Sequence, residues 1–333
     1  MAYNRRRFLN LISRSEPRVD DCWLHVNRTA MACRFEVTLP ASEERGIAVA
    51  TEALDEVDRL EARLTVFRES SEVSYVNAHA AAGPVKISEP LFNLLVQCKE
   101  LSEETGGAFD ITSGPLTRCW GFLRREGRVP TKDEIEAARS VIGSHNLILD
   151  HSASTIQFAT PGVEINLGSI GKGYALDCAG DLLANSLHSA LFNAGASSMR
   201  AIGAGEHGAG WTVGLRHPHL KFRRLGVLRL RDCALSTSGN EEQFFEHEGH
   251  RFSHIIDPRS GWPGESVTSV SVVAKTGALS DALATAFFVG GRALAEEYCA
   301  THGDVFVVML ESGAQQPITI GKIRTAGVLA CLS

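Results

Sequence analysis

The amino-acid sequence predicts an α+β fold, and the order of its elements carries the prediction. Patterns of short strands dominate from about residue 147 onward, and helical patterns interrupt them without the regular alternation of a doubly wound sheet. The chain has 333 residues, of which 44% are hydrophobic and 22% are charged. That balance is typical of a globular protein with a sizeable core, and it excludes a globally disordered or collagen-like chain.

The first part of the chain begins with a strand and two amphipathic helices. Residues 34–39 alternate between polar and apolar side chains, which predicts a strand. Apolar residues over 47–64 recur three or four positions apart, which predicts a helix. A second helix should begin after Ser88 as its N-cap and end at the glycine pair 106–107.

A third helix should begin at Thr131, because Thr131 and Glu134 have the spacing of a capping box. Further on, short apolar and alternating segments predict strands at 155–158, 163–167, 199–202, 211–215, 227–231, 252–256, 267–274 and 305–310. Helices should separate them at roughly 172–187, 278–289 and 291–302. We therefore expect a mobile segment over 1–20 and one domain over 21–333, with a weak boundary near residue 145.

Charge and hydropathy exclude two classes of partner. Lys and Arg number 33 and Asp and Glu number 39, so the formal net charge is −6. Such a chain has no general attraction for nucleic acid. No run of about 18 apolar residues is present, so no membrane span is expected.

The cysteines and the N-terminus bear on the compartment. The eight cysteines are scattered without a C-x-x-C pair, which predicts free thiols and fits a reducing compartment. The run Arg5-Arg6-Arg7 resembles the start of a twin-arginine export signal, but too few apolar residues follow it. We expect a cytoplasmic protein, with export as the alternative if a longer N-terminus or a working twin-arginine signal exists.

Two glycine-rich segments have patterns that can indicate phosphate binding. Residues 203–208 match G-x-G-x-x-G, but a strand pattern beginning at Trp211 follows, so a hairpin turn is expected there instead of a dinucleotide site. Residues 163–173 run from a predicted strand through a glycine turn into a helix near Tyr174. Backbone N–H groups at such a helix start can bind phosphate, and a purely structural turn is the alternative.

Three further residues have the chemistry of a catalytic site. Asp281 and Thr285 lie four positions apart and share one face of a predicted helix. Their oxygens suit Mg²⁺, although Ser280 or Asp281 is equally compatible with a simple helix cap. His254 lies in a predicted strand that leads to a turn, where a lone histidine is usually structural. The polar segment 236–240 follows another predicted strand and by itself is interpreted as a loop. A zinc site is not expected, because His250 has neither a cysteine nor a third histidine nearby.

In their order along the chain, these motifs resemble those of the ApbE-like flavin transferases, the FAD:protein FMN transferases. The resemblance extends from about Met31 to Val308. Its matching pieces are residues 31–33, 64–67, 71–74, 107–116, 120–122, 165–177, 193–198, 236–240, 253–258 and 281–285. The resemblance implies a mixed, largely antiparallel sheet with flanking helices, related to a T-fold-like core.

The resemblance also implies a reaction. The family binds FAD and, with Mg²⁺, transfers its FMN half to a Ser or Thr hydroxyl of an acceptor protein, while AMP leaves. The implied acceptor motif is Asp-x-x-[Ser/Thr]-Gly-Ala-[Ser/Thr]. The implied metal ligands are Asp281, Thr285 and an oxygen of the turn at Ser169. Some relatives have another acidic residue where this chain has Ala284, which removes one possible ligand.

The remaining site residues follow from the same resemblance. His254 is implied as the general base for the acceptor hydroxyl or as a phosphate contact, and Asp281 is assigned with it to catalysis. Phe67 stands where relatives often have a tyrosine stacked on the isoalloxazine ring, and Asn166 stands where some have aspartate. The implied FAD contacts are Met31, Phe67, Ala108, Phe109, Asp110, Asn166, Lys172, Ser238, Gly239, Ile255 and Ile256.

Other functions stay open at this point. The same site with water as the nucleophile would be an FAD pyrophosphatase that produces FMN and AMP. A metal site too poor to turn over would leave a non-catalytic FAD-binding protein, an alternative that Ala284, Asn166 and the variant segment 31–33 keep open. A redox flavoenzyme is a weaker idea, because no nicotinamide site is evident.

Overall fold

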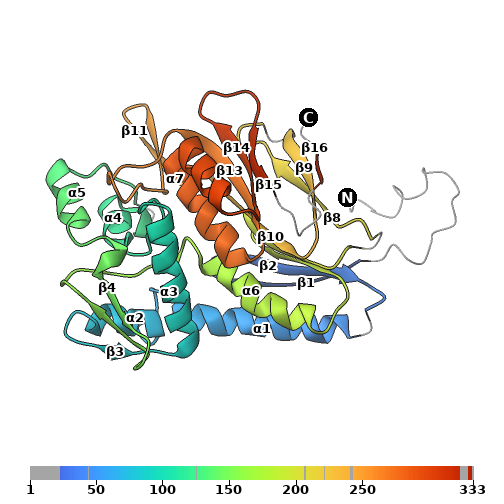
Figure 1. Cartoon of the computed structure of the whole chain (residues 1–333), viewed down its shortest axis with the longest axis horizontal. Coiled ribbons are helices and arrows are strands. Elements are labelled where there is room, and N and C mark those ends of the chain that lie inside the picture. The colour runs from blue at the N-terminus through green and yellow to red at the C-terminus, as the bar shows by residue number, and fades with distance from the viewer. Residues whose placement is uncertain are drawn as a thin grey trace, which may run out of the picture.

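The computed structural model describes residues 23–43, 45–124, 126–205, 208–220, 222–240, 243–322 and 329–331. An eight-stranded sheet runs through the molecule in the order β1-β2-β6-β7-β10-β13-β14-β15, and each neighbouring pair is antiparallel (Figure 1). Its strands are Trp23–Ala30, Cys33–Pro40, Ala190–Ala194, Ser198–Ile202, Cys233–Gly239, Val267–Ala274, Val305–Glu311 and Ile318–Lys322. The predicted α+β class with a largely antiparallel sheet is confirmed.

Three small sheets complete the strand inventory of the described residues. They are β3-β5-β4 (Val85–Lys86, Thr155–Phe158, Leu147–Asp150), β16-β9-β8 (Leu329–Cys331, Arg224–Leu230, Trp211–Arg216) and the hairpin β11-β12 (Phe244–His247, His250–Ser253). The helices are α1 (Gly46–Leu64), α2 (Glu72–His79), α3 (Glu89–Glu104), α4 (Gly114–Cys119), α5 (Lys132–Arg139), α6 (Gly171–Ala184) and α7 (Gly277–Thr301), with short 3-10 turns η2 (Phe122–Arg124) and η3 (Ser144–Asn146).

The large sheet is covered on both faces. Helices α1, α6 and α7 pack on one face, and the small sheet with β8 and β9 packs on the other. Strand β13 is buried along its whole length. Two consecutive residues of this strand, Val272 and Val273, belong to different hydrophobic clusters. Since successive side chains of a strand point to opposite faces, these two clusters are the two sides of the sheet.

Local signals fixed several helices as expected. Thr131 and Glu134 form both bonds of the capping box at the start of α5, and α3 ends just before Gly106 and Gly107, which have left-handed φ angles of 56° and 76°. The Ser88 side chain does not cap α3 as predicted. Its Oγ instead donates to Glu72 at 2.9 Å, which ties α3 to α2.

Three local predictions were wrong. Residues 163–167 are not a strand, because the backbone N–H and C=O of Ile165 bond to the side chain of Asn77 instead of a neighbouring strand. The polar segment 236–240, interpreted as a loop, lies mostly within the central strand β10. The glycine-rich segment 203–208 lies in a loop as expected, but it joins strands of different sheets and is not a hairpin turn.

Helix α7 combines the two helices predicted over 278–302, with Gly291 (φ 69°, ψ −164°) breaking it between them. Among the described residues it is the one helix long and apolar enough to cross a bilayer, and 67% of its most apolar window is buried within the protein. A helix that is apolar all round is expected at this central position on the sheet. The six cysteines with described side chains are free thiols, as predicted.

Two predictions about organisation are not tested here. The segment 1–20 lies outside the described residues. The weak boundary near residue 145 stays a prediction, and the principal hydrophobic cluster takes residues from both sides of it.

Candidate functional site

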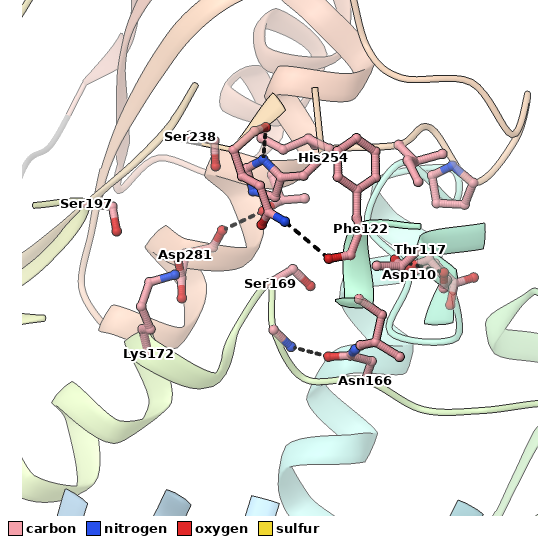
Figure 2. A pocket seen from close by; sticks show the side chains of 18 of the residues that line it. Asp110, Thr117, Phe122, Asn166, Ser169, Lys172, Ser197, Ser238, His254 and Asp281 are labelled. Atoms are coloured by element: carbon pink, nitrogen blue, oxygen red, sulfur yellow. Dashed lines mark hydrogen bonds between the residues drawn. The ribbon is translucent and has the colours of Figure 1, made fainter. Parts of the chain in front are cut away.

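A cavity of about 410 Å³ opens where several distant segments meet (Figure 2). The loop before α6, the start of α7, the end of β10 and the segment after β12 all line it. A second cavity of about 220 Å³ shares Ala32, Phe67, Asn166, Gly168 and Lys172 with the first. The two cavities are therefore adjacent, and together they suit an elongated ligand.

His254 is held in the larger cavity by the backbone. Its ring Nδ1 lies 3.0 Å from the carbonyl oxygen of Gln243, and its main-chain N–H donates to the same oxygen at 3.1 Å. The Gln243 side chain donates in turn to the carbonyl of Phe122 at 3.2 Å. A carbonyl oxygen only accepts, so Nδ1 carries the proton of the neutral ring and Nε2 keeps the lone pair.

The surroundings of His254 favour its neutral form. Burial lowers the pKa of this imidazole, and the positive charge of Lys172 lowers it further, while the bond to Gln243 opposes both effects. A neutral ring with its lone pair on Nε2 can accept a proton near neutral pH.

Asp281 lies in the first turns of α7 and is 6% exposed. Its Oδ2 accepts the backbone N–H of Gly173 at 3.0 Å, and its Oδ1 lies 3.4 Å from the Ser198 hydroxyl that donates to it. Burial raises the pKa of Asp281, and the charge of Lys172 and these two bonds oppose that rise. The Lys172 ammonium points toward the Asp281 carboxylate (Figure 2).

The structure brings the three predicted metal-ligating residues to one cavity. Thr285 lies one helical turn beyond Asp281, and its hydroxyl donates to the Asp281 carbonyl at 3.4 Å, which leaves the hydroxyl lone pairs available. Ser169 enters from the loop before α6. The position of Ala284 is fully buried in the principal hydrophobic cluster and is not part of the cavity lining.

This donor set fits a magnesium ion better than a zinc ion. Among the described residues, no group of three or more His, Cys, Asp or Glu side chains could hold a metal. Zinc prefers histidine nitrogen and cysteine sulfur ligands, whereas this site offers one carboxylate together with hydroxyl and backbone oxygens. It suits Mg²⁺, which takes few protein oxygens and completes its octahedron with waters and phosphates.

The loop before α6 presents polar groups to both cavities. The side-chain oxygen of Asn166 accepts the N–H of Gly168 at 2.9 Å, so its amide nitrogen is left as a donor. Lys172 is the second residue of α6 and lines both cavities. A cation beside a helix N-terminus provides a suitable environment for phosphate.

One end of the site is apolar and strained. Phe67 is 74% exposed and lines both cavities, so its ring face is available for stacking. Met31 and Ala32 form the turn between β1 and β2 with left-handed φ angles of 48° and 58°, which non-glycine residues rarely adopt. Met31 lines the smaller cavity and Ala32 lines both.

Most of the other implied FAD contacts also reach the larger cavity. They are Ala108, Asp110, Ser238, Gly239, Ile255 and Ile256. The carboxylate of Asp110 accepts the backbone N–H and the hydroxyl of Thr112 at 2.8 and 2.6 Å, while its burial raises its pKa. Phe109 is fully buried in the principal hydrophobic cluster and does not line either cavity.

Some lining residues escaped the sequence analysis. Ser113, Phe122, Ser197, Thr237 and Pro258 lie inside matching segments and could have been named from them, whereas Thr117, Leu123 and Gln243 lie outside. Gln243 had no detectable signal, because it acts on His254 through its backbone carbonyl, which every residue type has.

Comparison with known proteins agrees with this geometry. A FAD:protein FMN transferase of Treponema pallidum is 35% identical over 288 residues, which cover 80% of this chain and 77% of that protein. The FAD:protein FMN transferase of Vibrio cholerae is 31% identical over 278 residues, covering 81% and 82%.

Solved structures and a family model lead to the same assignment. The ApbE protein of Thermotoga maritima matches with a TM-score of 0.82 and 27% identity, over 90% of this chain and 97% of that one. The Pseudomonas stutzeri flavinyl transferase ApbE matches with a TM-score of 0.78, also at 27% identity, over 90% and 95%. The ApbE family model matches residues 31–309. The chain therefore belongs to the ApbE family.

Proposed function

We propose that this protein transfers the FMN half of FAD to a Ser or Thr hydroxyl of an acceptor protein, with release of AMP and with Mg²⁺ bound at Asp281. The convergence of His254, Asp281 and Thr285 on one cavity carries the proposal. The relatives named FAD:protein FMN transferase support the overall reaction. The acceptor hydroxyl and the metal are inferred from the chemistry of the cavity.

FAD has two ring systems joined by a pyrophosphate, and the two adjacent cavities can accommodate that order. The exposed ring of Phe67 would stack on the isoalloxazine, with Met31 beside it in the smaller cavity. The ammonium of Lys172, in the first turn of α6, would hold the pyrophosphate. Asp110 would accept a hydroxyl at the adenosine end, because its carboxylate lies in the lining of the larger cavity.

The chemical step needs a proton acceptor beside the reacting phosphorus. We assign this role to Nε2 of His254, whose ring is fixed by Gln243. The acceptor oxygen forms a bond to the FMN phosphorus as its proton moves to Nε2. The bond from that phosphorus to the bridging oxygen breaks, and the electron pair leaves with AMP.

Mg²⁺ would be held by Asp281, Thr285 and an oxygen of the Ser169 turn. When bound, it supplies positive charge that stabilises the phosphoryl oxygens during transfer. The chain itself keeps the Asp281 carboxylate in place through the N–H of Gly173 and the hydroxyl of Ser198.

The decisive assay measures AMP release from FAD with Mg²⁺, with and without a peptide that carries the expected acceptor motif. Asp281→Asn is compared with Asp181→Asn, a control whose carboxylate is 67% exposed on α6. The proposal expects AMP only with the peptide, a peptide mass gain equal to FMN minus water, and loss of both in Asp281→Asn alone.

Two other outcomes would replace the proposal. AMP release without peptide, abolished in Asp281→Asn, would indicate an FAD pyrophosphatase. Tight FAD binding without AMP in either condition would indicate a binding protein.

A further inference from the structure

Helices α6 and α7 meet at a pair of glycines near their N-termini (Figure 1). A Cβ on Gly173 would lie 2.0 Å from the carbonyl oxygen of Gly277, and a Cβ on Gly277 would lie 2.4 Å from the carbonyl oxygen of Gly173. No other residue type permits this approach. The backbones of the two helix starts are therefore in direct contact.

The contact is reciprocal in its hydrogen bonds as well. Each helix carries an aspartate four residues after its contact glycine, Asp177 on α6 and Asp281 on α7. Asp281 accepts the N–H of Gly173 on α6 at 3.0 Å. Asp177 accepts the N–H groups of Gly277 and Ala278 on α7 at 2.6 and 2.8 Å. Each helix thus satisfies backbone donors at the start of the other.

The two aspartates differ in what their oxygens do. Both oxygens of Asp177 accept short bonds from backbone N–H groups, and its side chain is 18% exposed. Asp281 uses one oxygen in the same way, while its other oxygen accepts a long 3.4 Å bond from the Ser198 hydroxyl. Asp281 also lines the cavity, near the positive charge of Lys172. One member of the pair is committed to the helix contact, and the other retains an oxygen for a ligand.

We propose that Asp177 is a positioning residue for the metal ligand Asp281. By holding the first two N–H groups of α7, it fixes the turn that leads to Asp281 and keeps that carboxylate at the cavity. Arg200 steadies Asp177 in turn, since its guanidinium donates to the Asp177 carbonyl at 2.7 Å and to Asp181 at 2.6 Å. This inference rests on the proposed magnesium site.

A simple capping role does not account for this arrangement. Thr276 already caps α7 from within the same chain segment, because its hydroxyl oxygen accepts the N–H of Leu279 at 3.3 Å. Asp177 adds a link between two helices, each of which carries residues of the cavity. Residues that orient a metal ligand commonly affect metal affinity by about 10–100-fold when replaced.

The test compares Asp177→Asn with two controls, Thr276→Ala and Asp181→Asn. Asparagine has one acceptor oxygen for two N–H groups, so one bond is lost. Thr276→Ala weakens the same helix start without touching α6. Asp181→Asn removes only the exposed negative charge beside Arg200, because the amide oxygen can still accept its single hydrogen bond. Three quantities are measured: the Mg²⁺ concentration that half-saturates the rise in Tm, the Mg²⁺ concentration that half-saturates AMP release, and FAD affinity without Mg²⁺.

The proposal expects both Mg²⁺ concentrations to rise about 10–100-fold in Asp177→Asn, with FAD affinity within about threefold of wild type. Both controls should keep the wild-type Mg²⁺ concentrations, although Thr276→Ala lowers Tm. Equal Mg²⁺ responses in Asp177→Asn and wild type, or equal shifts in Asp177→Asn and Thr276→Ala, would overturn the positioning role. If neither the Tm nor the AMP release of the wild-type protein changes with Mg²⁺ concentration, the magnesium site itself would be overturned.

Discussion

The carbonyl oxygen of Gln243 accepts the Nδ1–H of His254 at 3.0 Å and so selects the tautomer of the ring. This leaves the lone pair on Nε2 for the proton of the proposed acceptor hydroxyl. The same carbonyl accepts the His254 backbone N–H at 3.1 Å, so Gln243 fixes both the ring and its main chain.

The burial of His254 predicts the pH dependence of transfer. Burial lowers the pKa of His254, so the neutral, proton-accepting ring persists below its ordinary pKa of about 6.5. As pH falls, kcat/KM should decline with a midpoint below about 6.5. His254→Gln should lower kcat by about 10²–10⁴-fold and abolish that decline, with FAD affinity retained. A midpoint above the ordinary value, or an unchanged profile in His254→Gln, would contradict the base role.

The contact between α6 and α7 predicts a sharp difference between two glycines of one helix. Gly173→Ala places a Cβ 2.0 Å from a backbone oxygen and should lower the free energy of unfolding by about 1–3 kcal/mol or more. At Gly171 the nearest atom to an added Cβ is 3.9 Å away, so Gly171→Ala should leave stability unchanged or raise it by up to about 1 kcal/mol. Urea denaturation measures both, and equal losses would argue against the contact.

The exposed ring of Phe67 predicts a loss of affinity without a loss of stability. Because the side chain is 74% exposed, Phe67→Ala should leave Tm unchanged. Loss of a stacking free energy of about 0.5–1.5 kcal/mol should weaken FAD binding by roughly two- to thirteenfold. Phe67→Tyr should bind as wild type, and Tyr75→Ala, an exposed aromatic outside both cavities, is the control. Flavin fluorescence titration gives the affinities, and equal effects of Phe67→Ala and Tyr75→Ala would refute stacking.

The turn between β1 and β2 predicts an unusual response to glycine. Ala32 is exposed and has a left-handed φ of 58°, which costs an alanine about 1–2 kcal/mol. Ala32→Gly relieves this cost, but the greater entropy of the unfolded chain lowers the free energy of unfolding by about 0.4–1 kcal/mol. The net free energy of unfolding should therefore stay constant or rise slightly. Ala137→Gly, at an exposed position in α5, should lose about 1 kcal/mol. Comparable losses in chemical denaturation would show that the turn is unstrained.

Sequence patterns predicted those parts of the fold whose causes are local. The capping box at Thr131, the glycine stop after α3 and the break in α7 at Gly291 all follow from residues within a few positions. The polar strand β10 could not be predicted in this way. Its hydroxyls at Ser236 and Thr237 pair with Ser280 and Ser271, which are distant in sequence.

The candidate site likewise contains residues that the sequence could identify and residues that it could not. Side chains proposed to act directly, such as Asp281 and Lys172, belong to recognisable motifs and line the cavity. Gln243 bonds to His254 through a backbone carbonyl, and Asp177 bonds to α7 across a helix contact that exists only after folding. Phe109 shows the opposite case, since it lies in a matching motif but packs into the core.

The fate of the FMN group tests the central claim most directly. We would incubate the protein with FAD, Mg²⁺ and the acceptor peptide, quantify AMP, and locate the FMN by tandem mass spectrometry. The account predicts one AMP for each modified peptide, with FMN on the Ser or Thr oxygen, and no product when that residue is alanine. Free FMN in place of modified peptide would contradict the account. Equal AMP release with the acceptor peptide and with its alanine variant would also contradict it.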